Sequence, residues 1–172
     1  MRTKRSVHVT LTAAFAALYA VGVIFLAPIS FQVFQVRIAD ALLPLSILFG
    51  WPVILGVSLG ALVANFFGGL GPIDMVGGAV ANFVATFLAW QVARRRSKPW
   101  MLAGACVEII VVTTIVGTYL SYLFGIPIEA GWTGVLLGSI IAIGILGSLL
   151  LGALSTQRVK ALLRAHNLDS ES

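Results

Sequence analysis

The sequence predicts an all-α integral membrane protein, a compact bundle of six transmembrane helices with both termini in the cytoplasm. Hydrophobic residues make up 59% of the 172 residues and charged residues only 10%, whereas roughly a quarter of the residues in a soluble domain are charged. Mean hydropathy is +1.04. The apolar sequence also divides into segments that are long enough to cross a bilayer.

Basic residues form three clusters that predict the topology. They lie at residues 2–5, 94–98 and 158–164. Because Lys and Arg near membrane spans favour the cytoplasmic side, we expect both termini and the middle loop inside, with an even number of spans between clusters. This topology accounts for the formal net charge of +5 without a nucleic-acid partner. A basic patch would also suit anionic lipid headgroups.

The first span is expected at residues 7–27, in a single membrane domain that covers residues 1–172. Its length crosses about 30 Å at about 1.5 Å per residue, and a cleavable signal peptide would have a shorter apolar core. One face consists of small residues that allow another helix to approach closely, namely Ala13, Ala16, Ala17 and Ala20. Their spacing alone favours packing inside the protein's own bundle.

Residues 28–37 are expected to form a loop on the outer face of the membrane. The loop carries two rings, two amides and a cation, in Phe31, Phe34, Gln32, Gln35 and Arg37. These side chains suit closure over a ligand. They equally suit an interfacial segment that anchors its aromatic residues at the level of the lipid headgroups.

The next three spans follow from two turn signals. Residues 41–73 carry no charge but are too long for one span, and glycines and prolines at 50–52 and 68–72 divide them. We therefore expect spans at 38–49, 53–67 and 73–93. The first two of these are short, which predicts tilt or local thinning of the bilayer.

The last two spans are expected at residues 100–124 and 132–156, joined by an outer loop at 125–131 that holds Glu129. Glu108 interrupts the first of them, and we favour a structural role for this acid. Thr118 and Tyr119 lie toward the outer end of the same span, on a face of polar and small residues.

The stretch from Gly60 to Asn82 places polar side chains in otherwise apolar sequence. Polar residues inside membrane spans usually mark binding sites or pathways. The polar groups expected toward the outer leaflet are Arg37, Asp40, Asn65, Asp74, Asn82, Thr118 and Glu129. Together they predict an outward-facing pocket for a small molecule.

Motifs for catalysis and for nucleotide or metal binding are missing from the sequence. It has no GxxxxGK[ST] phosphate loop, no HExxH, no cysteine cluster and no GxSxG elbow. We expect no enzyme, no cofactor and no metal, so the energy for any transport must come from other subunits. The less favoured class is a membrane enzyme acting on lipid, for which Glu108 is the candidate centre.

Two segments resemble a known family. QVRIADALLPL and FGWPVILGVSLGALVANFFGGLGPIDMVGGAVANFVA are similar to the signature of the QueT-type queuosine-precursor transporters, over roughly residues 31–93. These proteins are substrate-binding S components of energy-coupling factor (ECF) transporters. The resemblance implies a six-helix S component in the cell membrane whose outer pocket is closed by the loop after the first span.

The resemblance also implies partners and a cargo. A transmembrane coupling protein, with two cytoplasmic ATPases, would dock on the alanine face of the first span. The cargo would be a 7-deazaguanine such as queuine or its aminomethyl precursor. Because the family more often has glutamate at position 40 and a hydroxyl residue near position 82, another purine-like or vitamin-like cargo stays open.

The implied cargo assigns roles to the polar residues. One carboxylate accepts the paired N–H donors of a guanine-like edge, and an aminomethyl cation needs a second acid. Asp74 is the candidate for one role, and Asp40 or Glu129 for the other. Asn65 and Asn82 would bond the carbonyl and ring nitrogens, while Phe31, Phe34 or Tyr119 would stack on the base.

Overall fold

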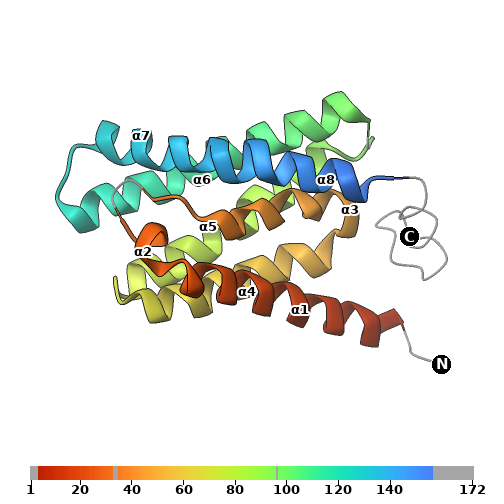
Figure 1. Cartoon of the computed structure of the whole chain (residues 1–172), viewed down its shortest axis with the longest axis horizontal. Coiled ribbons are helices and arrows are strands. Elements are labelled where there is room, and N and C mark those ends of the chain that lie inside the picture. The colour runs from red at the N-terminus through yellow and green to blue at the C-terminus, as the bar shows by residue number, and fades with distance from the viewer. Residues whose placement is uncertain (1–3, 33–34, 96, 157–172) are drawn as a thin grey trace.

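Helices form all the regular structure in the described part of the chain. The computed structural model describes residues 4–32, 35–95 and 97–156 (Figure 1). The elements in order are α1 (Lys4–Phe25), α2 (Ala27–Ser30), η1 (Ile38–Leu45), α3 (Ser46–Phe49), α4 (Trp51–Gly68), α5 (Pro72–Val92), α6 (Lys98–Phe124), α7 (Ile128–Ser139), η2 (Ile140–Gly147) and α8 (Ser148–Leu154). Here η1 is a 3₁₀ helix and η2 a π-helical stretch.

Five of the described helices are long and apolar enough to cross a membrane. They are α1, α4, α5, α6 and the continuous rod of α7, η2 and α8 that runs from Ile128 to Leu154. Their bounds lie within a few residues of five of the expected spans. The chain is therefore a multi-pass helical membrane protein.

The segment expected as the second span is helical but too short to join these five. Eight of its twelve residues, Ile38–Leu45, are 3₁₀ helix, which rises about 2.0 Å per residue. Ile38–Phe49 therefore covers roughly 22 Å, against about 30 Å of hydrocarbon. It passes through the middle of the bundle and contacts α1, α4, α5, α6, η2 and α8, so surrounding protein shields its irregular backbone from lipid.

The loop expected at residues 125–131 is shorter than predicted. Gly125 ends α6 in the left-handed conformation, with φ 63°, and Pro127 directly precedes the first residue of α7. A left-handed glycine closes a helix, and proline suits the start of the next one. Glu129 therefore lies in the first turn of α7, not in a loop.

Helix α1 packs on α4 through glycines. A Cβ atom added at Gly60 would lie 2.7 Å from the carbonyl oxygen of Ala16, and one at Gly56 would lie 2.7 Å from Cβ of Phe15. The close approach turns Ala16 and Ala20 toward the bundle, whereas Ala13 and Ala17 stay exposed. The small residues of α1 thus divide into an inner and an outer pair.

The hairpin of α4 and α5 is closed by a glycine turn and an amide. Gly69 and Gly71 have φ values of 73° and 96°, which residues with a side chain rarely adopt. The side-chain nitrogen of Asn65 donates to the carbonyl oxygen of Asp74 at 2.7 Å. This bond fixes Asp74 in the first turn of α5, where the helix N-terminus favours a negative charge.

Candidate functional site

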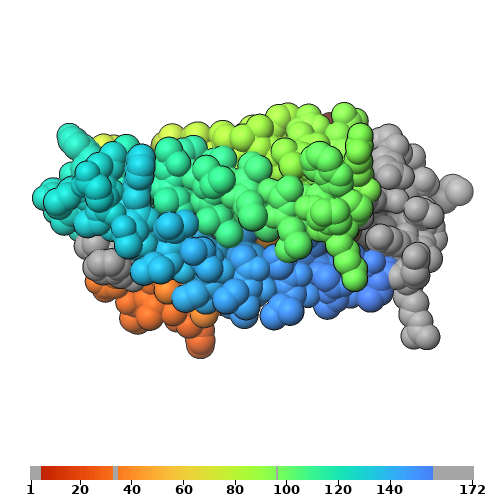
Figure 2. All heavy atoms as spheres, turned by 90° about the horizontal axis from the view of Figure 1, so that it is seen from above, coloured from red at the N-terminus to blue at the C-terminus, as the bar shows by residue number. Residues whose placement is uncertain are grey.

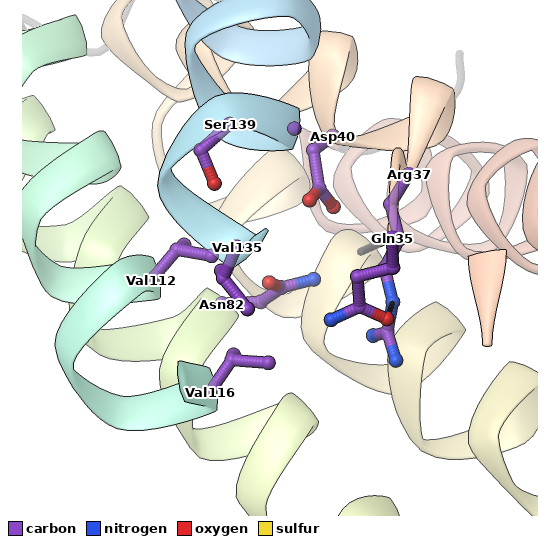
Figure 3. A pocket seen from close by; sticks show the side chains of 9 residues that line it. Gln35, Arg37, Asp40, Asn82, Val112, Val116, Val135 and Ser139 are labelled. Carbon is purple, nitrogen blue, oxygen red and sulfur yellow. Dashed lines mark hydrogen bonds between the residues drawn. The ribbon is translucent and has the colours of Figure 1, made fainter. Parts of the chain in front are cut away.

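A small polar cavity lies in the bundle beneath the segment that enters η1 (Figure 3). Its volume is ≈10 Å³, about the space needed by one water molecule. Its lining residues are Gln35, Arg37, Asp40, Asn82, Val112, Val116, Val135, Gly138 and Ser139. Figure 3 shows the side chains of Asp40, Asn82 and Ser139 pointing toward a common space.

Arg37 is the cation of the site and directly precedes η1. Its side chain is 5% exposed, and its Nη2 lies 3.6 Å from Oδ1 of Asp74. Its Nε donates to the carbonyl oxygen of Ser30 at 3.3 Å and to Oε1 of Gln35 at 3.2 Å. The guanidinium also lies 5.5 Å from the ring centroid of Phe31. A buried guanidinium stays charged, so these contacts hold a permanent cation at the cavity.

Asp40 is the acid of the cavity and is tied to α1. The Tyr19 hydroxyl donates to Oδ1 of Asp40 at 2.5 Å, and both side chains are buried. Tyr19 was not among the residues singled out from the sequence, because an alanine-rich span gives no sign that this ring turns inward. The bond links the cavity to the helix that carries the alanine face.

The two asparagines have different surroundings. Asn82 lines the cavity, and its amide donates to the carbonyl oxygen of Val57 on α4 at 3.3 Å. Asn65 instead spans the hairpin to Asp74 and lies directly against Gly78, outside the lining. Asn82 therefore faces the cavity while Asn65 faces the joint between the two helices.

Asp74 does not line the cavity but contacts Arg37, which does. It is fully buried, pairs with Arg37, and accepts a hydrogen bond from the Tyr119 hydroxyl at 2.9 Å. The Tyr119 ring packs against Gly77, where an added Cβ would lie 2.8 Å from it. Asp74 thus positions the arginine that lines the cavity.

Two more predicted residues lie on the outside of the bundle, and one cannot be placed. Thr118 is exposed, and its hydroxyl accepts from Nε1 of Trp132 at 3.0 Å. Glu129 is exposed at the start of α7. Phe34 lies outside the described residues.

The apolar wall of the cavity was not singled out as a site. Val112 and Val116 lie on α6, while Val135, Gly138 and Ser139 lie on α7. A Cβ atom at Gly138 would collide with the carbonyl oxygen of Gln35, so this glycine lets the entering segment rest on α7. The sequence does carry one signal for this wall, because small residues recur every four positions at 134, 138 and 142.

Buried polar atoms without hydrogen bonds gather around the Arg37–Asp74 pair, next to the cavity. Within the described residues they include Arg37 Nη2, Asp74 Oδ2 and Asn65 Oδ1. An unsatisfied buried polar group costs about 1–3 kcal/mol, and such atoms occur where a ligand or water completes the site. The arrangement suits a polar molecule that offers both donors and acceptors.

Glu108 occupies a separate place deeper in the bundle. It is fully buried and accepts from the Ser46 hydroxyl at 3.4 Å through Oε1, while Oε2 has no partner. Within the described residues, no three His, Cys, Asp or Glu side chains gather closely enough to hold a metal ion. The bond to Ser46 joins α6 to α3.

The fold and the cavity define a class, a multi-pass helical membrane protein with a buried polar site among its spans. A model of the QueT transporter family matches residues 9–156, which is most of the chain. The protein belongs to this family of membrane transporters. Comparisons with curated proteins and with solved structures find no match.

Proposed function

We propose that this protein is the substrate-binding S component of an ECF importer and captures a queuosine precursor for ATP-driven uptake. The observation that carries the proposal is the buried constellation of Arg37, Asp40 and Asn82 around one cavity. Membership of the QueT transporter family supports the same cargo class. A cation, an acid and an amide together complement a heterocycle that has adjacent donors and acceptors.

The cavity chemistry fits a 7-deazaguanine. Asp40 accepts the paired N–H donors of the guanine-like edge, and the Asn82 amide bonds a ring nitrogen. The Arg37 side chain, which lines the same cavity, donates to the ring carbonyl oxygen. Val112 and Val116 supply apolar contact for the faces of the ring.

An aminomethyl cargo adds a cation that needs a second carboxylate. Asp74 has one oxygen without a hydrogen bond and pairs with Arg37, which lines the cavity. Tyr119 is half-buried and covers this acid from outside. The proposed second acid is therefore Asp74, whereas Glu129 is exposed at the start of α7 and is the less favoured one.

Cargo binding requires the cavity to open. A volume of ≈10 Å³ holds one water and not a bicyclic base. The segment that carries Gln35 and Arg37 covers the cavity and rests on Gly138. We propose that this segment lifts from α7 to admit the cargo and closes over it.

The proposed topology has six passes, both termini in the cytoplasm and the pocket facing outward across the cell membrane. The described chain begins in α1 and ends after α8 at the same end of the bundle (Figure 1). Five membrane-spanning helices alone would leave the two ends of the described chain on opposite sides of the membrane. The short segment Ile38–Phe49 therefore supplies the sixth pass. Arg94, Arg95 and Lys98 are exposed at that shared end, which supports placing it inside.

The proposed coupling surface is the outer face of α1. Ala13 and Ala17 are exposed there, while Ala16 and Ala20 pack toward the bundle. A groove of ≈390 Å³ lies between α1 and α4 and includes Ala13 and Leu59 in its lining. We propose that the transmembrane coupling protein docks on this face and connects the bundle to the two ATPases.

Titration of the purified protein with queuine, 7-aminomethyl-7-deazaguanine, guanine and adenine tests the cargo, with thermal shift and calorimetry as readouts. We expect binding of a deazaguanine and at least tenfold weaker binding by Asp40→Asn, about 1.4 kcal/mol. Thr118→Val is the matched control, because its side chain lies outside the cavity. Binding of none of the four compounds, or equal affinity in Asp40→Asn, would refute the assignment.

A further inference from the structure

A second hollow lies at the end of the bundle where the basic residues gather, apart from the polar cavity. It is a groove of ≈340 Å³ between the first turns of α6 and helix α8. Figure 2 shows the start of α6 and α8 lying against each other at one end of the molecule. The residues that line the groove include Lys98, Met101, Leu102, Leu151, Gly152 and Ser155.

The floor and walls of the groove are apolar. Met101 and Leu151 are buried and belong to one hydrophobic cluster, and Leu102 is 58% exposed along the wall. Gly152 has no atom within 4 Å of the position that its Cβ would take, so the groove is open beside it. A surface of this kind on membrane helices suits an acyl chain.

One cation, Lys98, lines the groove, and two more lie just before it in the chain. Lys98 is exposed at its mouth, and Arg94 and Arg95 are exposed just before α6. The Arg95 guanidinium lies 5.4 Å from the ring centroid of Trp100. The acids in the described residues are Asp40, Asp74, Glu108 and Glu129. The first three are buried in the bundle, and the fourth lies at the start of α7, at the opposite end from the groove.

We propose that this groove binds one anionic phospholipid, with an acyl chain along α6 and α8 and its phosphate at Lys98. Basic side chains near the membrane surface attract anionic headgroups, and the apolar walls bury the chain. A zwitterionic lipid fills the same walls but carries a cation of its own, which Lys98 repels. The charge of Lys98 therefore selects the anionic class.

Native mass spectrometry of the full chain in mixed micelles of phosphatidylglycerol and phosphatidylcholine tests the site. We expect one retained phosphatidylglycerol per chain, and a loss of about fivefold or more in retention for Lys98→Ala, the order expected for one basic side chain at a membrane surface. Arg5→Ala removes an exposed charge from α1 at the same end and is the matched control. An equal loss of lipid retention in both variants would show general charge attraction and overturn the proposed lipid site.

A second variant tests the apolar part without touching the charge. Gly152→Leu fills the open space, and leucine is favoured over glycine in a helix, so we expect unchanged thermal stability and loss of the retained lipid. Retention unchanged in a stably folded Gly152→Leu would overturn the proposal. A chain ending at Thr156 should retain the lipid as the full chain does. A rise of about fivefold in lipid retention by that shorter chain would show that residues 157–172 occupy the groove, and it would equally overturn the proposal.

Discussion

Asp74→Asn tests whether the Asp74 carboxylate stabilises the fold through its ion pair with Arg37. The two charged atoms lie 3.6 Å apart with both side chains buried, and their attraction is about 5 kcal/mol at an effective dielectric constant of about 20. Removing one partner of a buried pair costs about 3–5 kcal/mol, because the other charge stays buried. Asparagine preserves the shape of the side chain and still accepts a hydrogen bond from Tyr119, so the loss of stability reports on the charge alone.

Thermal unfolding in detergent measures this cost. For a chain of this length, 1 kcal/mol corresponds to about 2–4 °C in Tm, so we expect Asp74→Asn to lower Tm by roughly 6–20 °C. The double variant Arg37→Gln/Asp74→Asn removes both charges and should regain at least half of the loss. Glu129→Gln, on an exposed side chain, is the control and should leave Tm unchanged.

The same variant also tests whether Asp74 contributes to cargo binding. We expect at least tenfold weaker cargo binding by Asp74→Asn, about 1.4 kcal/mol, because Arg37 loses the group that orients it. A Tm within about 3 °C of the parent protein would refute the pair as a structural element. Unchanged affinity would remove Asp74 from the site.

Three further predictions concern other parts of the bundle. Gly138→Ala should displace the segment at Gln35 and weaken cargo binding at least tenfold, about 1.4 kcal/mol. The control Gly152→Ala, in open space, should leave cargo binding unchanged. Equal affinities of the two variants in calorimetry would contradict the contact between Gly138 and Gln35. Tyr19→Phe removes a buried hydrogen bond to Asp40 and should cost about 1–3 kcal/mol of stability; an unchanged melting curve would show that the bond contributes nothing. Ala17→Trp should leave cargo binding intact and abolish co-purification with the coupling protein, and normal co-purification would exclude the outer face of α1.

Helix positions were predictable because membrane spans are encoded locally. In hydrocarbon, an apolar run with no charges is stable as a helix, because a helix satisfies its backbone hydrogen bonds internally. Glycine and proline signals at residues 50–52 and 68–72 placed the breaks between helices correctly. The outer loop predicted at 125–131 was too long, because α7 begins directly after Pro127.

The candidate site was only partly predictable. Asp40, Arg37, Gln35 and Asn82 stand out as polar residues in apolar sequence, and all four line the cavity. Asp74 stands out equally, yet it does not line the cavity and pairs with Arg37 instead. A sequence pattern marks which groups are costly to bury, but it does not say which of them face one another.

The sequence by itself determined the class, a helical membrane protein of the QueT family type, because hydropathy, basic clusters and local motifs are properties of single segments. Only the tertiary structure decided that a short 3₁₀ segment runs through the middle of the bundle and brings Arg37 and Asp40 to one cavity. It also decided that Tyr19 bonds Asp40 and that Val112, Val116 and Gly138 form the opposite wall. These contacts join residues far apart in the chain, and their geometry depends on how closely the glycines let the helices approach.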